Sequence, residues 1–109
     1  MGDGTLERLA ETIKSRRGDS GAKSYTRQLL DGGAERCAKK FGEEAVETVI
    51  AGIGTDAKAL TSEAADTLYH LLVLLEVRGV ALADVLSELD KRMGVSGLDE
   101  KAARTKGPA

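Results

Sequence analysis

The chain has few of the residues that mark disulfide-rich, zinc-binding or β-rich proteins. Its 109 residues include one Cys, one His, one Pro and no Trp. A single Cys excludes an intramolecular disulfide and a Cys-rich zinc site, and a single His excludes a multi-His metal centre. Aromatic residues make up only 3% of the chain. The core therefore has to be built from Leu, Val, Ile and Ala, which favours packed helices over a β-sandwich.

Long apolar runs and a strong excess of charge are also missing. No segment approaches the run of about 20 apolar residues that spans a membrane, and the opening "MGDGTLERLAETIKSRRG" lacks the apolar region of a signal peptide. The formal net charge of -2 is too near neutral for a nucleic-acid surface or a polybasic membrane contact. We therefore expect one small cytoplasmic domain with neither nucleic acid nor membrane as a partner.

Apolar residues recur at helical spacing along most of the chain, and no alternating pattern predicts a strand. Glycines and capping residues separate the predicted helices. These helices cover residues 5–17, a short element at 24–31, and residues 34–50, 56–78 and 81–93. In the last of them, the side chains expected to face inward are Leu82, Val85, Leu86, Leu89 and Met93.

The pattern predicts an all-α fold, a bundle of about four to five helices over residues 1–93, followed by a polar C-terminal tail at 94–109. From Leu68 to Leu75 the fourth helix is apolar almost all the way round, apart from His70. Such a helix needs neighbours on every side. Because a chain this short offers few, we expect a second copy of the chain to complete the bundle.

Carboxylates gather on one face of the helix predicted at 34–50. Glu43, Glu44 and Glu47 fall within an arc of roughly 100°, and Glu63 and Asp66 lie three residues apart near the start of the next helix. The "GIGTD" break lets the two helices run antiparallel, so that the two acidic faces can meet inside the bundle. The apolar stripe opposite the first group consists of Ala38, Phe41, Ala45, Val46 and Val49.

Two interpretations of these carboxylates follow from the residues alone. Acidic helix faces are commonly solvated surface, and acids in a first helical turn favour the helix dipole. Matched pairs on consecutive helices instead favour a metal site. Ligands that are all oxygen suit a hard cation, Mg²⁺ or Mn²⁺.

The segments "GEEAVET" and "SEAADTLYHLLVLL" together resemble the metal motif of the all-α nucleoside triphosphate pyrophosphohydrolases, the MazG-like superfamily. "SYTRQLLDGG" and "ADTLYHLLVLLEVRGVALADVLSELDKR" are similar to segments of the phosphoribosyl-ATP pyrophosphatases in that superfamily. The resemblance implies a Mg²⁺-dependent homodimeric hydrolase of histidine biosynthesis. Such an enzyme converts 1-(5-phosphoribosyl)-ATP into 1-(5-phosphoribosyl)-AMP and pyrophosphate.

By position in the motif, the resemblance implies that the metal ligands are Glu44, Glu47, Glu63 and Asp66. It also implies a catalytic base that takes a proton from water, and either Glu43 or Glu44 fits that role.

Five further residues are candidates for substrate binding: Ser24, Tyr25, Thr26, Lys40 and His70. The "SYT" triplet belongs to the family pattern, although its hydroxyl groups can equally cap a helical turn. Lys40 lies closer to the acidic face than Lys39 does. The imidazole falls one turn after Asp66, where it either assists the site or is a buried core histidine.

Two other functions stay open. A pyrophosphohydrolase that removes non-standard or excess (d)NTPs would share the metal motif, so only its substrates would distinguish it. A non-catalytic helical dimerisation module with an acidic surface would bind no Mg²⁺.

Overall fold

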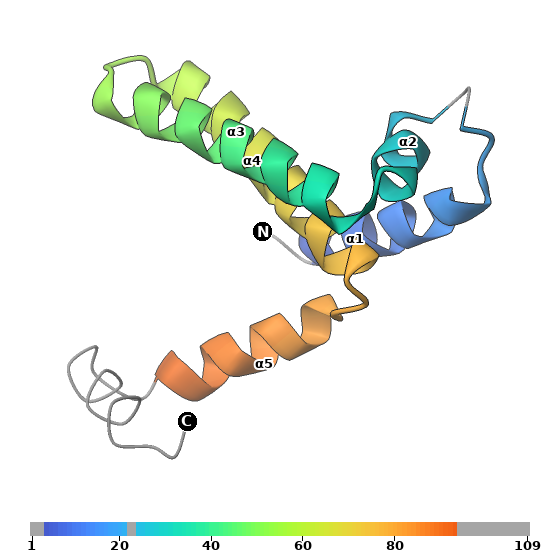
Figure 1. The fold of residues 1–109 in the computed structure, drawn as a ribbon. Coiled ribbons are helices and arrows are strands. Elements are labelled where there is room, and N and C mark those ends of the chain that lie inside the picture. Colours follow the sequence, from blue (N-terminus) through green and yellow to red (C-terminus); the bar gives the residue numbers. More distant parts are fainter. Residues whose placement is uncertain (1–3, 22–23, 94–109) are drawn as a thin grey trace.

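The computed structural model describes residues 4–21 and 24–93. In this part of the chain all regular structure is helical, which confirms the predicted all-α fold (Figure 1). The predicted tail at 94–109 lies outside the described residues, so the division into domain and tail stays a prediction. The α-helices are α1 (Thr5–Ser15), α2 (Tyr25–Asp31), α3 (Gly33–Ile53), α4 (Ala57–Val77) and α5 (Leu82–Met93), with a 3-10 turn, Arg16–Gly18, after α1.

The two longest helices, α3 and α4, form an antiparallel hairpin, as predicted (Figure 1). Asp56 caps α4, because its Oδ1 accepts hydrogen bonds from the backbone N–H groups of Lys58 and Ala59 at 3.0 and 3.2 Å. At the other end, α2 passes into α3 almost without a loop. Gly33 makes this corner with a φ of 85°, a left-handed conformation that favours glycine.

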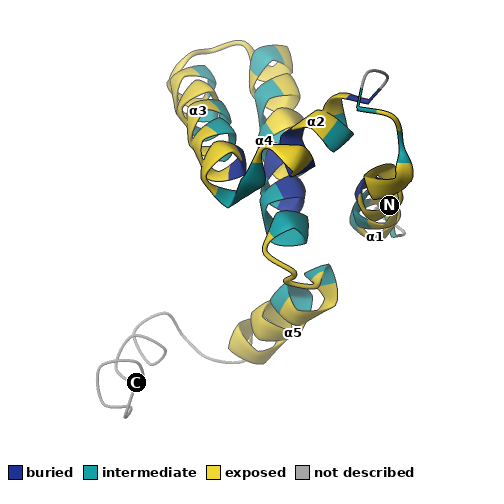
Figure 2. Ribbon diagram, turned by 45° about the vertical axis from the view of Figure 1, so that its right-hand side comes forward, coloured by how far each residue is buried: buried dark blue, intermediate teal, exposed yellow. Residues whose placement is uncertain are grey.

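The core lies where α1 and α2 meet one end of the hairpin (Figure 2). Cys37 belongs to it: its thiol donates a hydrogen bond to the backbone oxygen of Leu29 at 3.1 Å. Burial raises the pKa of this thiol, so Cys37 serves packing rather than chemistry. The buried residues that form the core are Ile13, Leu29, Leu30, Cys37, Leu72 and Val73.

The far half of the hairpin carries apolar side chains on its surface. Val46 and Val49 of the apolar stripe predicted on this helix are 57% and 60% exposed. Ala38 of the same stripe, nearer the core, is exposed as well. Leu68 of the apolar helix is 44% exposed. The reason is that none of the other helices described in the structure covers this half (Figure 1).

The last helix, α5, points away from the bundle (Figures 1 and 2). Leu82 is its only residue that packs against the core. Leu89 and Met93, predicted to face inward, are exposed. None of the helices in the described segments is both long enough and apolar enough to cross a membrane.

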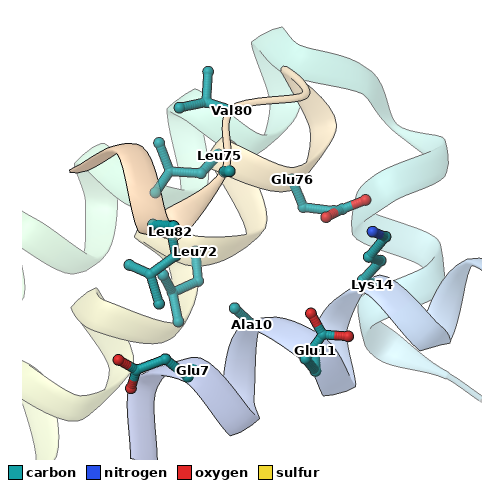
Figure 3. Close-up of a pocket in the computed structure, with 11 residues that line it drawn as sticks. Glu7, Ala10, Glu11, Lys14, Leu72, Leu75, Glu76, Val80 and Leu82 are labelled. Atoms are coloured by element: carbon teal, nitrogen blue, oxygen red, sulfur yellow. The ribbon is translucent and has the colours of Figure 1, made fainter. Parts of the chain in front are cut away.

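A cavity of about 260 Å³ lies between α1, α4 and the start of α5 (Figure 3). Ala10, Leu72 and Leu82 contribute apolar surface to it, and Glu7 and Lys14 are among its charged lining residues. None of the predicted site residues lines this cavity.

Candidate metal and nucleotide site

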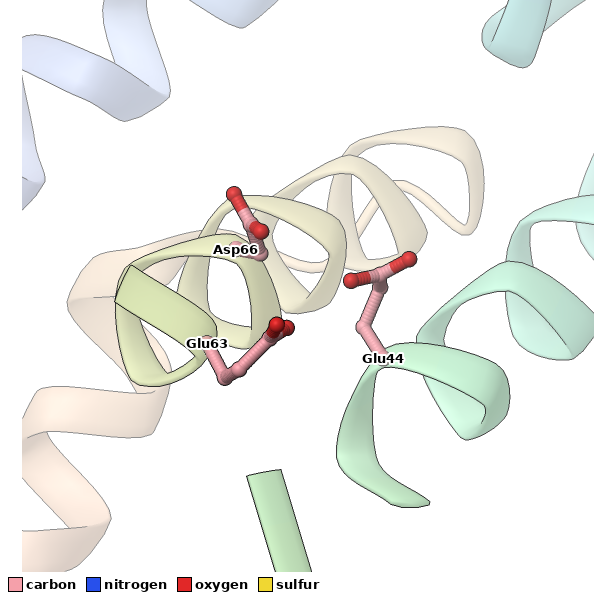
Figure 4. Close-up of side chains that lie close together, drawn as sticks. All are labelled: Glu44, Glu63 and Asp66. Atoms are coloured by element: carbon pink, nitrogen blue, oxygen red, sulfur yellow. The ribbon is translucent and has the colours of Figure 1, made fainter. Parts of the chain in front are cut away.

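Three of the predicted metal ligands come together across the hairpin. Glu44 of α3 faces Glu63 and Asp66 of α4, and one carboxylate oxygen from each lies within 4.8 Å of the others (Figure 4). Glu44 and Glu63 are half-buried, and Asp66 is exposed. We call these three residues the acidic cluster. The i,i+3 spacing on α4 and the antiparallel course of α3 produce it.

Two threonines hold the helices together beside the acidic cluster. The Thr48 hydroxyl lies 3.0 Å from the backbone oxygen of Glu63 and 2.6 Å from the Thr67 hydroxyl. The Thr67 hydroxyl lies 3.0 Å from the backbone oxygen of Glu44. These contacts fix the register of α3 against α4, and with it the separation of the carboxylates. The sequence prediction missed this threonine clamp, although each threonine follows a cluster glutamate by four residues.

We expect Thr48→Val to lower the free energy of unfolding by about 1 kcal/mol and to weaken Mg²⁺ binding roughly tenfold, because the register of the two helices loosens. Urea unfolding and titration calorimetry measure the two effects. Thr61→Val is the matched control: the Thr61 hydroxyl donates to the backbone oxygen of Ala57 on the exposed side of α4, within a single helix. Equal behaviour of both variants would show that the threonine clamp does not position the acidic cluster.

The surroundings of Glu63 in the acidic cluster raise the pKa of its carboxyl group. Partial burial is the largest cause that raises the pKa of this carboxyl group, followed by the negative charges of Asp66, Glu47 and Glu44. Glu47, the fourth predicted ligand, is exposed and lies outside the cluster of three. It is nevertheless close enough to add to the repulsion, which a cation would relieve.

The donor set fits a small hard cation. Mg²⁺ binds oxygen atoms at about 2.1 Å, so its ligands lie at most about 4.2 Å apart. Small side-chain rotations would bring the three oxygens, now within 4.8 Å, to that separation. Three or four protein carboxylates leave further positions for water and for phosphate oxygens. Mn²⁺ accepts the same donors.

The side chain of His70 lies close to the acidic cluster and is buried, with a relative exposure of 6%. Its Nδ1 has no hydrogen-bond partner among the described residues, and the ring packs edge-on against Tyr69 at 4.9 Å. Burial lowers the pKa of His70, while the charges of Glu44 and Lys40 act on it in opposite directions. The imidazole is therefore neutral near pH 7, and its role towards substrate stays a prediction.

The "SYT" triplet starts α2 beside this histidine. Ser24 is buried and caps α2, since its Oγ accepts a hydrogen bond from the backbone N–H of Arg27 at 3.0 Å. The Thr26 hydroxyl lies 2.5 Å from that of Tyr69 and so joins α2 to α4. Both hydroxyl groups thus have partners within the protein. Tyr25, 51% exposed and edge-on to His70, is the member of the triplet that offers a surface to a ligand.

Glu43 and Lys40 lie next to the acidic cluster on α3. Glu43 is exposed, and its carboxylate pairs with the Lys40 ammonium group at 3.4 Å. Glu43 is not part of the cluster of three, and its role towards water stays a prediction. The ion pair places Lys40 beside an acidic residue of the same helix.

Comparisons with known proteins identify the family of this chain. The sequence model of the phosphoribosyl-ATP pyrophosphohydrolase family matches residues 6–93. A protein of Bradyrhizobium diazoefficiens named phosphoribosyl-ATP pyrophosphatase 1 is 59% identical over 92% of this chain and 94% of its own length. Proteins named phosphoribosyl-ATP pyrophosphatase from Paracoccus denitrificans and Dinoroseobacter shibae are 58% and 57% identical, each over 91% of this chain and over 92% and 97% of their own lengths. This chain belongs to the phosphoribosyl-ATP pyrophosphohydrolase family.

Proposed function

We propose that this chain hydrolyses 1-(5-phosphoribosyl)-ATP to 1-(5-phosphoribosyl)-AMP and pyrophosphate in histidine biosynthesis. Its acidic cluster would hold Mg²⁺, or Mn²⁺ in its place, with Glu47 as the fourth ligand. The observation that carries the proposal is the convergence of three carboxylates from two helices within 4.8 Å. This convergence occurs in a chain whose relatives bear the name of that activity.

Charge explains why the site needs a cation. The substrate is a dense anion, and the carboxylates of the acidic cluster alone would repel it. When bound, Mg²⁺ would supply positive charge to the phosphate oxygens and to the attacking water. The half-buried carboxylates of Glu44 and Glu63 hold their positions because the threonine clamp fixes the helices that carry them. The protein thus contributes a preorganised set of oxygen ligands.

The remaining step for the chain is to take a proton from the attacking water. Glu43 suits this role because its carboxylate stands outside the acidic cluster, at the edge of the same helix face. Glu44 is the alternative base, since it adjoins the same space. Attack by water releases pyrophosphate when the bond between the α- and β-phosphates breaks. Cys37 takes no part as a nucleophile, because it is buried and its raised thiol pKa keeps it protonated.

We infer further that the protein acts as a cytoplasmic homodimer. The exposed apolar surface on α3 supports the second copy.

The function is tested by measuring pyrophosphate release with Mg²⁺ from phosphoribosyl-ATP and, in parallel, from ordinary and modified (d)NTPs. We expect turnover of phosphoribosyl-ATP at a much higher kcat/KM than that of any (d)NTP. A preference for a (d)NTP would keep the metal site but assign the chain to the removal of unwanted nucleotides. Inactivity on every substrate would favour the non-catalytic dimerisation module.

A further inference from the structure

A groove of about 450 Å³ follows the first half of α3, and its lining is rich in cations. Lys40 is already paired with Glu43 at 3.4 Å. Arg36 and Lys39, by contrast, are exposed and make no ion pair or side-chain hydrogen bond within the described part of the chain. The five lining residues are Glu35, Arg36, Lys39, Lys40 and Glu43. We call it the basic groove.

The basic groove leads to the acidic cluster. Arg36, Lys40 and Glu44 follow one another at intervals of four residues, so they share one helix face and each lies about 6 Å further along the axis. Glu43 lines the groove and is the neighbour of Glu44 in the sequence. An extended anion held by the acidic cluster through a cation would therefore reach the groove along this face.

The buried side chain of His70 supports this adjacency. Lys40 on the groove and Glu44 in the acidic cluster both act electrostatically on His70. The positive end of the groove and the acidic cluster are therefore both near enough to His70 to act on its charge. The unpartnered Nδ1 of that ring adds a polar atom that the described residues leave without a hydrogen bond.

We propose that the basic groove binds those phosphate groups of the nucleotide that the metal in the acidic cluster does not hold. The proposal rests on the proposed function, because phosphoribosyl-ATP carries phosphate in two places, its triphosphate and its ribosyl 5-phosphate. Both offer the same chemistry to Arg36 and Lys39, namely charge-assisted hydrogen bonds to phosphate oxygens. A groove that took the ribosyl phosphate would also select against ordinary (d)NTPs, which lack it.

Kinetics of single and double substitutions test the groove. In Arg36→Gln and Lys39→Gln the KM for phosphoribosyl-ATP is expected to rise roughly tenfold for each cation removed, with a smaller change in kcat. Lys58→Gln, which removes an exposed cation near the start of α4 at the other end of the hairpin, should leave both constants unchanged. A KM of the double variant within about twofold of the wild-type value would overturn the proposal.

Two inhibitors identify which phosphate the groove holds. Inorganic pyrophosphate reports on the triphosphate end, and ribose 5-phosphate reports on the ribosyl phosphate. A weaker inhibition of the Arg36→Gln, Lys39→Gln double variant by either compound supports the groove and assigns its occupant. Unchanged inhibition by both compounds contradicts it.

A binding titration without turnover tests whether the groove binds phosphate, independently of whether the protein hydrolyses phosphoribosyl-ATP. Metal-free protein is titrated with millimolar inorganic pyrophosphate and ribose 5-phosphate, and the NMR shifts of the backbone amides of residues 35–43 are followed. Shifts that occur in the wild type and vanish in the double variant support the groove, even if phosphoribosyl-ATP is not turned over. Identical shifts in both proteins, or none in the wild type, overturn it.

Discussion

Glu44→Gln and Asp66→Asn should each lower kcat/KM for phosphoribosyl-ATP by roughly a thousandfold, which corresponds to about 4 kcal/mol of lost transition-state stabilisation. Each amide keeps the shape of the side chain it replaces but removes the charge that a hard cation requires. Both residues belong to the cluster whose oxygens lie within 4.8 Å of one another. Steady-state kinetics at several Mg²⁺ concentrations would show the loss.

The fold of these variants should survive, and the metal-free proteins should be at least as stable as the wild type. The reason is that each substitution removes a charge that raises the pKa of Glu63. Circular dichroism and urea unfolding measure this directly. Glu11→Gln, on the exposed side of α1, is the control and should remain fully active. If a cluster variant keeps about a tenth of the wild-type activity, the residue that it replaces is not a metal ligand.

Ile50→Glu should convert a dimer into a monomer, with a loss of dimer affinity of roughly a hundredfold or more. Four apolar residues on α3 recur at helical spacing and form one exposed stripe: Val46, Val49, Ile50 and Ile53, at 57%, 60%, 60% and 80% exposure. A stripe of this size on a small chain marks a protein interface. A second copy is the expected occupant, because α4 also needs apolar neighbours at Leu68.

Sedimentation measurements over a range of protein concentrations would test the interface. Val80→Glu is the matched control, since Val80 is a 42% exposed apolar residue in the turn before α5 rather than on the α3 stripe. The wild type and the control should sediment as dimers, and Ile50→Glu should sediment as a monomer. A monomeric wild type, or a dimeric Ile50→Glu variant, would contradict the assigned interface.

The helices that the sequence predicted well are those with local signals. Ser24 and Asp56 cap α2 and α4, and such caps are readable from the sequence because capping depends on a few neighbouring residues. The start of α3 was predicted one residue late, since Gly33 both turns the chain and begins the helix. The exposure of Val49 and Met93 was not predictable from periodicity, which gives a common face but not what covers it.

The acidic cluster was predictable because it, too, depends on local signals in the sequence. The i,i+3 spacing of Glu63 and Asp66 and the short connection between two helices are both readable from the chain, and together they bring Glu44 opposite. The threonine clamp was missed because Thr48 and Thr67 carry no periodic signal in a helix. The basic groove was missed as well, because the sequence drew attention to Lys40 and left Arg36 out.

Thermal unfolding with and without Mg²⁺ tests most directly whether a cation binds between these carboxylates. The pKa of Glu63 in the folded, metal-free protein is raised above its ordinary value of 4.5. The ionised side chain therefore destabilises the fold at pH values above the folded pKa, and this penalty disappears below the ordinary value. Mg²⁺ binds the ionised carboxylates, so its stabilising effect is present above the folded pKa and is lost as the pH falls through it.

We predict that Mg²⁺ at about 100 times its Kd raises Tm by roughly 10 °C near neutral pH, and that the increase shrinks towards zero near pH 4.5, the ordinary pKa of a glutamate side chain. Glu63→Gln should show little Mg²⁺ effect at either pH. A wild-type Tm that does not respond to Mg²⁺ at neutral pH, or an increase that persists unchanged in Glu63→Gln, would contradict a metal site at the acidic cluster.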